Sequence, residues 1–248
     1  MNPPSRFWGP WATLGFGAAV IVVSVIVQAI ITVIFVIVEL APTLREDLDI
    51  FDYSELLERI DMGLLISLSI IISAIICLGL IYLFIKAKRG AVFIEYVGFR
   101  RPGIKAVLVV LAVMVGFIVL SALVNYALDI SAETDVMTEA YLTSVWPGLF
   151  WIAAVVFAPV FEEVFFRGFL FEGFRNSKMG AIGAILLTSL FWSVSHLQYN
   201  LFQIASIFVM GIIFGIARHK TGTIWAPLIM HVFNNLLAVL LISIDFGM

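Results

Sequence analysis

Three charged residues stand inside an apolar stretch of this chain: the adjacent acids Glu162 and Glu163, and the base Arg167. An ionisable group in the hydrocarbon region costs roughly 2.5–3.5 kcal/mol on insertion scales, so such groups normally face protein or a wet cavity. Glu163 and Arg167 share one face of a helix, with the acid first, which favours an ion pair. Glu162 points about 100° away. We expect Glu163 and Arg167 to hold the geometry and Glu162 to do chemistry.

Two further apolar segments carry polar pairs with the same helical spacing. Trp192 and His196 are four residues apart, and so are His231 and Asn235. A single histidine in an apolar helix is usually satisfied by a hydrogen bond to a neighbouring helix. Two histidines and a carboxylate pair in one half of the chain favour a functional site, because each buried ionisable group is costly.

These residue types suit hydrolysis of an amide bond inside the membrane. A carboxylate kept from bulk water can act as a general base, so Glu162 can take a proton from water. His196 can orient that water and later protonate the leaving amine. His231 and Asn235 can donate hydrogen bonds to one oxyanion, each worth about 2.7–4 kcal/mol in known cases. The predicted supporting residues are Glu163, Arg167 and Trp192.

The composition indicates the environment in which these residues must be placed. Of the 248 residues, 62% are hydrophobic and only 12% are charged. Seven apolar runs approach the length of about 20 residues that crosses a bilayer. We therefore predict an all-α, polytopic membrane helical bundle of about seven transmembrane helices, with a four-helix catalytic core in its C-terminal half. The expected spans are about 11–38, 63–85, 106–128, 147–175, 180–196, 201–217 and 224–244.

The remaining features of composition limit the partners and the cofactors. The first apolar run is too long for a removed signal peptide, so we expect it to be retained. The single cysteine, Cys77, excludes an internal disulfide and a cysteine-rich metal site. No basic tract indicates nucleic acid. We expect N-terminal helices and loops over residues 1–146 and a catalytic unit over residues 147–248.

The distribution of Lys and Arg predicts the orientation, because both accumulate in cytoplasmic loops. Seven crossings place Arg6 and the basic connector 86–105 on one side, and Arg45 and Arg59 on the other. We predict an integral multi-pass protein of a bacterial or archaeal cell membrane, with the N-terminus cytoplasmic and the C-terminus outside. His196 then falls at the outer end of its span. Either that helix continues further, or the link 198–200 dips into a wet cavity that opens outward.

Three motifs, in order, resemble those of the family that contains the type II CAAX prenyl endopeptidases and the bacteriocin-processing and immunity proteins, often called CPBP or Abi. The resemblance covers about residues 147–244, and the segment 218–227 adds to it. The motifs are Glu162-Glu163-x-x-x-Arg167, an aromatic residue four before His196, and His231-x-x-x-Asn235.

The resemblance implies a glutamate-dependent intramembrane endopeptidase in which the acid and first histidine activate water and the third motif stabilises the oxyanion. It implies a membrane peptide or lipidated protein as substrate and a cytosolic access to the site. We expect no cofactor. The aromatic residue of the second motif is usually Phe in the family, whereas it is Trp192 here. We expect this difference to change the shape of the pocket more than its chemistry.

Other functions remain open at this point. Glu162, His196 and His231 are a two-histidine, one-carboxylate set that suits zinc, although they lie on three spans and no His-Glu-x-x-His motif occurs. A non-catalytic scaffold or bacteriocin-immunity protein would sequester a hydrophobic peptide and would not need Glu162. A transporter would use Glu162 as a proton relay, but the sequence shows no inverted repeats.

Overall fold

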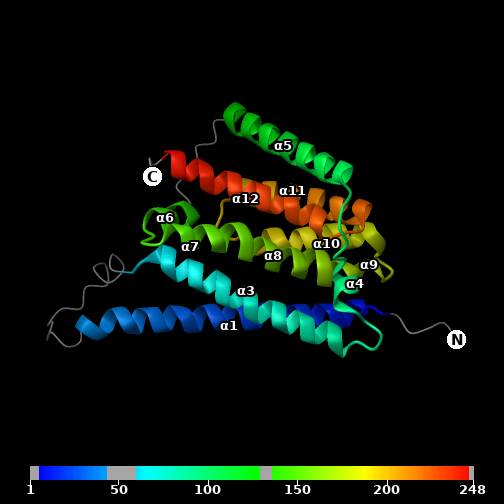
Figure 1. Ribbon diagram of the computed structural model, residues 1–248, viewed down its shortest axis with the longest axis horizontal. Coiled ribbons are helices and arrows are strands. Elements are labelled where there is room, and N and C mark those ends of the chain that lie inside the picture. Colours follow the sequence, from blue (N-terminus) through cyan, green and yellow to red (C-terminus); the bar gives the residue numbers. More distant parts are fainter. Residues whose placement is uncertain (1–5, 44–59, 129–135, 246–248) are drawn as a thin grey trace.

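The structure is a computed structural model that describes residues 6–43, 60–128 and 136–245. Within these ranges all regular elements are helices, which confirms the predicted all-α, polytopic helical bundle (Figure 1). The helices are α1 (Pro10–Thr43), α3 (Met62–Ala87), α4 (Phe93–Val97), α5 (Ile104–Ala127), α6 (Val136–Leu142), α7 (Pro147–Ile152), η1 (Ala153–Phe157), α8 (Ala158–Glu162), η2 (Glu163–Leu170), α9 (Phe171–Arg175), α10 (Gly180–Val194), α11 (Leu201–Thr221) and α12 (Trp225–Asp245).

Six of the seven predicted spans are helices long and apolar enough to cross a membrane, counted over the described ranges. The remaining one, α10, has only 15 residues, or about 22 Å at about 1.5 Å per residue. It ends early because two side chains take the carbonyl of Trp192, to which a continuing helix would bond. Ser195 Oγ donates to this carbonyl at 2.7 Å and His196 Nδ1 bonds it at 2.7 Å, a known competition between side chains and helix backbone.

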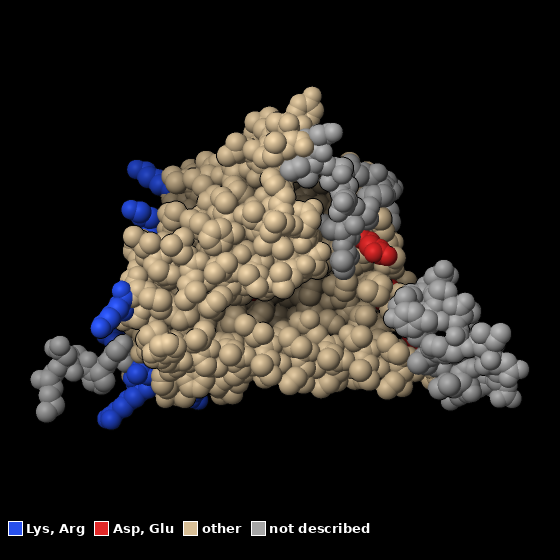
Figure 2. Space-filling model, turned by 180° about the vertical axis from the view of Figure 1, so that it is seen from behind, with Lys and Arg blue, Asp and Glu red and all other residues tan. Residues whose placement is uncertain are grey.

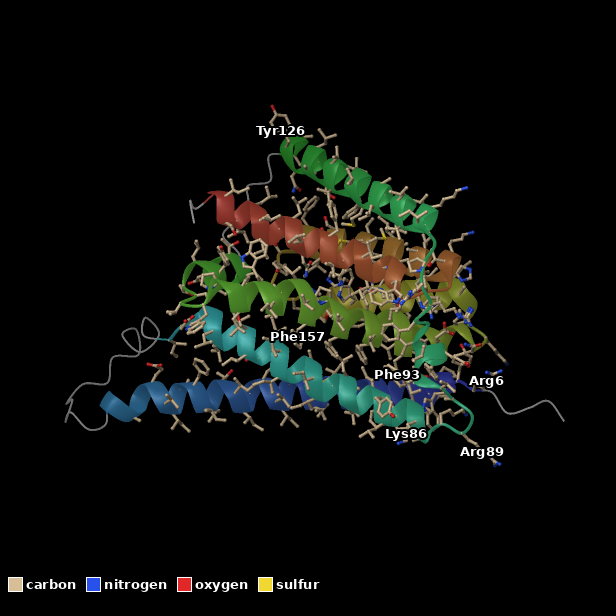
Figure 3. The ribbon with its side chains drawn as sticks, viewed as in Figure 1. Arg6, Lys86, Arg89, Phe93, Tyr126 and Phe157 are labelled. Atoms are coloured by element: carbon tan, nitrogen blue, oxygen red, sulfur yellow. The ribbon has the colours of Figure 1, made fainter. Side chains whose placement is uncertain are left out.

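The long helices run between two ends of different charge. Arg6, Lys86 and Arg89 lie at one end and Tyr126 lies at the other (Figure 3). In the space-filling view, Lys and Arg gather at one end, and the acidic residues in view lie toward the opposite end (Figure 2). Arg45 and Arg59, on which the predicted orientation also rests, lie outside the described residues.

The segment α7 to α9 is one continuous helical path through the middle of the bundle (Figure 1). Pro159 lies in it and favours a distortion, since its ring removes a backbone donor. The distortion takes the form of two π-helical stretches, η1 before Pro159 and η2 after Glu162. Such stretches are rare and often accompany functional sites. Every residue of η2 is buried, so the acidic pair stands at the point where the path enters the core.

Candidate active site

Glu163 and Arg167 form a fully buried ion pair within η2. Arg167 Nη1 donates to Glu163 Oε1 at 3.0 Å, and both side chains are 0% exposed. His231 Nδ1 lies 3.0 Å from the same carboxylate oxygen. A buried charge without a partner would be strongly destabilising, so Glu163 balances Arg167 and at the same time anchors the histidine of α12.

The guanidinium of Arg167 also ties η2 to the hairpin formed by α10 and α11. It lies 4.4 Å from the ring centroid of Trp192 and 5.3 Å from that of Phe214. Its Nη2 donates to the carbonyl of Gly211 at 3.3 Å. The helices approach closely here, because a Cβ added at Gly211 would meet Ser189 at 3.0 Å. Arg167 therefore fixes the backbone positions of three helices around the acidic pair.

Glu162 has different surroundings from its neighbour. Its side chain is 19% exposed, whereas that of Glu163 is fully buried. Its Oε2 accepts a hydrogen bond from Trp192 Nε1 at 2.5 Å and lies 3.9 Å from His231 Nε2. The two adjacent acids thus have different environments: Glu163 lies in a buried charge network, and Glu162 faces open space.

That space is a cavity of about 590 Å³, called the central cavity below. Its lining residues come mainly from α1, α8, η2, α10, α11 and α12. The structure brings five of the residues singled out in the sequence to its wall: Glu162, Trp192, His196, His231 and Asn235. Ser24 and Gln28 of α1 also line it. In the sequence they are polar residues four apart on an apolar helix, a pattern that does not by itself indicate a functional site.

His196 lies in the turn after α10, so the link following that helix does reach the cavity, the second of the two arrangements considered above. Its Nδ1 bonds the carbonyl of Trp192 at 2.7 Å. A carbonyl only accepts, so Nδ1 carries the proton and Nε2 of the neutral ring has a lone pair. The imidazole is therefore set to accept a hydrogen bond or a proton at Nε2.

His231 and Asn235 are held one turn apart on α12 by different partners. Because Nδ1 of His231 faces the Glu163 carboxylate, its Nε2 donates only when the ring carries both protons. Asn235 Nδ2 donates to the carbonyl of Ala154 at 2.9 Å. Its Oδ1 accepts from Asn234 Nδ2 at 3.3 Å. One amide hydrogen of Asn235 is thus committed to η1, which leaves the second for another acceptor.

The donor set considered for zinc comes together only in part. Glu162 Oε2 and His231 Nε2 are 3.9 Å apart, while Nδ1 of His196 is occupied by the Trp192 carbonyl. Among the residues that the structure describes, no three His, Cys, Asp or Glu side chains are grouped as a metal ion requires.

A second buried charge cluster, centred on Arg218, was not foreseen from the sequence. Arg218 Nη2 donates to Glu172 Oε1 at 2.8 Å and to the carbonyl of Val97 at 3.2 Å. Its Nε donates to the carbonyl of Arg167 at 3.0 Å. Arg218, on α11, therefore links that helix to α4, η2 and α9.

Comparisons with known proteins agree with these motifs. Residues 144–237 match the family model described as type II CAAX prenyl endopeptidase Rce1-like. An Escherichia coli protein, described as an uncharacterized 24.3 kDa protein, is 32% identical over 123 residues, which are 48% of this chain and 56% of that protein. The chain thus spans about half the length of the curated relative it matches. No solved structure matches it. The family match over residues 144–237 confirms the resemblance seen in the three motifs.

Proposed function

We propose that this protein is an intramembrane endopeptidase that hydrolyses a peptide bond of a membrane-associated substrate, with Glu162 as the residue that activates water. The observation that carries the proposal is the contrast between the adjacent acids. Glu163 is fully buried against Arg167 and His231, while Glu162 opens to the central cavity. A carboxylate that merely stabilised the fold would not need a cavity of about 590 Å³ beside it.

The proposed reaction assigns one proton transfer to each step. Glu162 takes a proton from a water molecule, whose oxygen attacks the carbonyl carbon of the scissile bond. His196 orients the water through its Nε2 lone pair, receives at Nε2 the proton that Glu162 took up, and delivers it to the amine nitrogen when the C–N bond breaks. The products are a carboxylic acid and an amine, and Glu162 and His196 are back in their starting states.

The tetrahedral intermediate carries its negative charge on the former carbonyl oxygen. Asn235 can donate its second amide hydrogen to that oxygen, and His231 can donate from Nε2 when doubly protonated. Glu163 supports this role because it holds Nδ1 of His231 at 3.0 Å. The bond from Asn235 to Ala154 fixes the orientation of the amide, which reduces the reorganisation needed during the reaction.

A neighbouring cavity supports a hydrophobic or lipidated substrate. A largely apolar space of about 900 Å³ lies between α1 and α10, lined by residues such as Leu14, Leu187 and Phe191. Phe191 also lines the central cavity. An apolar part of the substrate would occupy the larger space while its peptide bond reaches Glu162.

We propose that the reaction needs no metal ion. The alternative, a zinc-dependent metallopeptidase, is tested by measuring the metal content of the purified protein and its cleavage rate after treatment with a chelator. Stoichiometric zinc whose removal abolishes cleavage would establish the metallopeptidase.

The central test compares membrane peptides in cells that carry the wild-type protein and in cells that carry Glu162→Gln. The expected result is a peptide product that disappears in the variant while the amount of protein in the membrane stays the same. An unchanged set of products would favour a non-catalytic scaffold or immunity protein. The predicted orientation, N-terminus cytoplasmic and C-terminus outside, is part of this proposal and is tested separately by labelling the termini.

A further inference from the structure

A cavity between α5 and α11 adjoins the central cavity. Its volume is about 440 Å³, and it is called the side cavity below. The two cavities share four lining residues: Tyr199, Ile207, Met210 and Asn234. Because the same side chains line both, the side cavity borders the cavity that contains Glu162.

The side cavity is lined in part by polar side chains. Ser121 and Asn125 of α5 and Ser206 of α11 line it. Within the described part of the chain, none of these three side chains has a hydrogen-bond partner. An unsatisfied polar group in a membrane-spanning helix is unfavourable, and a cavity of about 440 Å³ has room for water beside these groups. Water molecules are the simplest partners that satisfy all three.

The side cavity lies toward the end of the bundle away from the basic residues. Asn125 is next to Tyr126, which Figure 3 places opposite Arg6 and Lys86. Ser206 lies in the first half of α11, whose last turn contains the basic residues of that helix. At the start of α11, Asn200 and Gln203 form a reciprocal capping box, and both line the cavity.

We propose that the side cavity is the route by which water reaches Glu162, and that it opens on the membrane face opposite the basic residues. The inference rests on the proposed function only in one respect, namely that the water is consumed by hydrolysis at Glu162. Each hydrolysis consumes one water molecule, so a site enclosed by apolar helices needs a hydrated path. This assignment favours outward access, in agreement with the charge distribution, over the cytosolic access that the family resemblance implies.

Cysteine labelling tests the route without any proteolysis. The native cysteine, Cys77, is buried and is first replaced in a Cys77→Ser background of the full chain. Ser206→Cys places a thiol in the side cavity, while Ala205→Cys places one on the adjacent exposed position outside both cavities. The probe is a negatively charged, membrane-impermeant methanethiosulfonate added to one face of sealed vesicles, and Lys178→Cys marks the basic face.

The expected result is that Ser206→Cys reacts at least about tenfold faster than Ala205→Cys, because only a hydrated thiol ionises to the reactive thiolate. It should react from the face where Lys178→Cys does not. Equal rates for the two cysteines, or reaction of Ser206→Cys from the Lys178→Cys face, would overturn the proposal. Fast labelling of Ser206→Cys together with an unchanged product spectrum in Glu162→Gln would retain the water route and reject the protease.

A kinetic comparison completes the test. Ser206→Leu fills the route and should lower kcat about tenfold with KM nearly unchanged, since water supply and not substrate binding is impaired. Ala205→Leu adds the same volume outside the cavity and should leave kcat unchanged. Equal kcat values for the two leucine variants would contradict a water route through this cavity.

Discussion

The indole nitrogen of Trp192 donates a hydrogen bond to the carboxylate of Glu162, across the boundary between α10 and α8. The same indole ring lies 4.4 Å from the guanidinium carbon of Arg167 and 5.3 Å from the ring centroid of His231. Trp192 is therefore in contact with the proposed base and with the network that holds the oxyanion site. Phe at this position would have no donor for Glu162, so Trp in place of Phe adds a hydrogen bond as well as changing the shape of the side chain.

Replacing Trp192 with Phe removes this donor and keeps an aromatic ring. A hydrogen bond to a charged group contributes about 1.5–3 kcal/mol, so we expect kcat/KM to fall about 10- to 100-fold. Steady-state cleavage of a reporter peptide measures it. Trp151→Phe, a change outside the central cavity, should leave the rate unchanged. A Trp192→Phe variant as active as wild type would show that Glu162 does not depend on the indole.

The two adjacent acids should respond differently to the same substitution. Glu163→Gln leaves Arg167 without its buried counter-charge and should reduce stability by about 3–5 kcal/mol. Glu162→Gln should abolish cleavage while the unfolding temperature stays near that of wild type. Thermal unfolding in detergent separates the two effects. A second change, Glu163→Gln with Arg167→Met, should recover part of the loss, and failure to recover any would indicate another cause of the destabilisation.

The sequence predicts those parts of the site that lie within one helix. Glu163 and Arg167 pair as expected because residues four apart face each other within a helix, and this holds even in the π-helical stretch η2. Contacts between distant segments could not be read in this way. Arg218 reaches Val97, which lies 121 positions away in the chain, and nothing in local spacing distinguishes it from an exposed basic residue.

The end of α10 shows a different limit of the sequence. The apolar run continues through residue 196, and hydropathy alone predicts a helix that continues with it. The helix stops because Ser195 and His196 take the carbonyl of Trp192 with their own side chains. The residue predicted to do chemistry therefore also ends the helix that carries it, which brings its ring to the cavity.

Asn235→Ala should separate positioning from binding in the oxyanion site. Loss of one preorganised donor typically lowers kcat about 10²- to 10³-fold, and KM should change little because the interaction strengthens only in the transition state. Asn234→Ala, which removes a neighbour in hydrogen-bond contact with Asn235 Oδ1, should have a smaller effect. If the two variants lost equal activity, Asn235 would act through its packing against Ala154 and not as a donor.

Gly98 and Arg218 make a stability prediction that is independent of catalysis. Gly98 has a φ of +83°, and an added Cβ would lie 2.6 Å from Arg218 Nη2. Gly90 has a similar φ of +78° but nothing within 4 Å of an added Cβ. Both Ala variants therefore carry the backbone cost of a left-handed residue, about 1–2 kcal/mol, and only Gly98→Ala must also displace Arg218. The difference between their unfolding temperatures measures the contribution of the Arg218 contacts with Glu172 and Val97. Equal losses in the two variants would mean that Arg218 can move aside without cost.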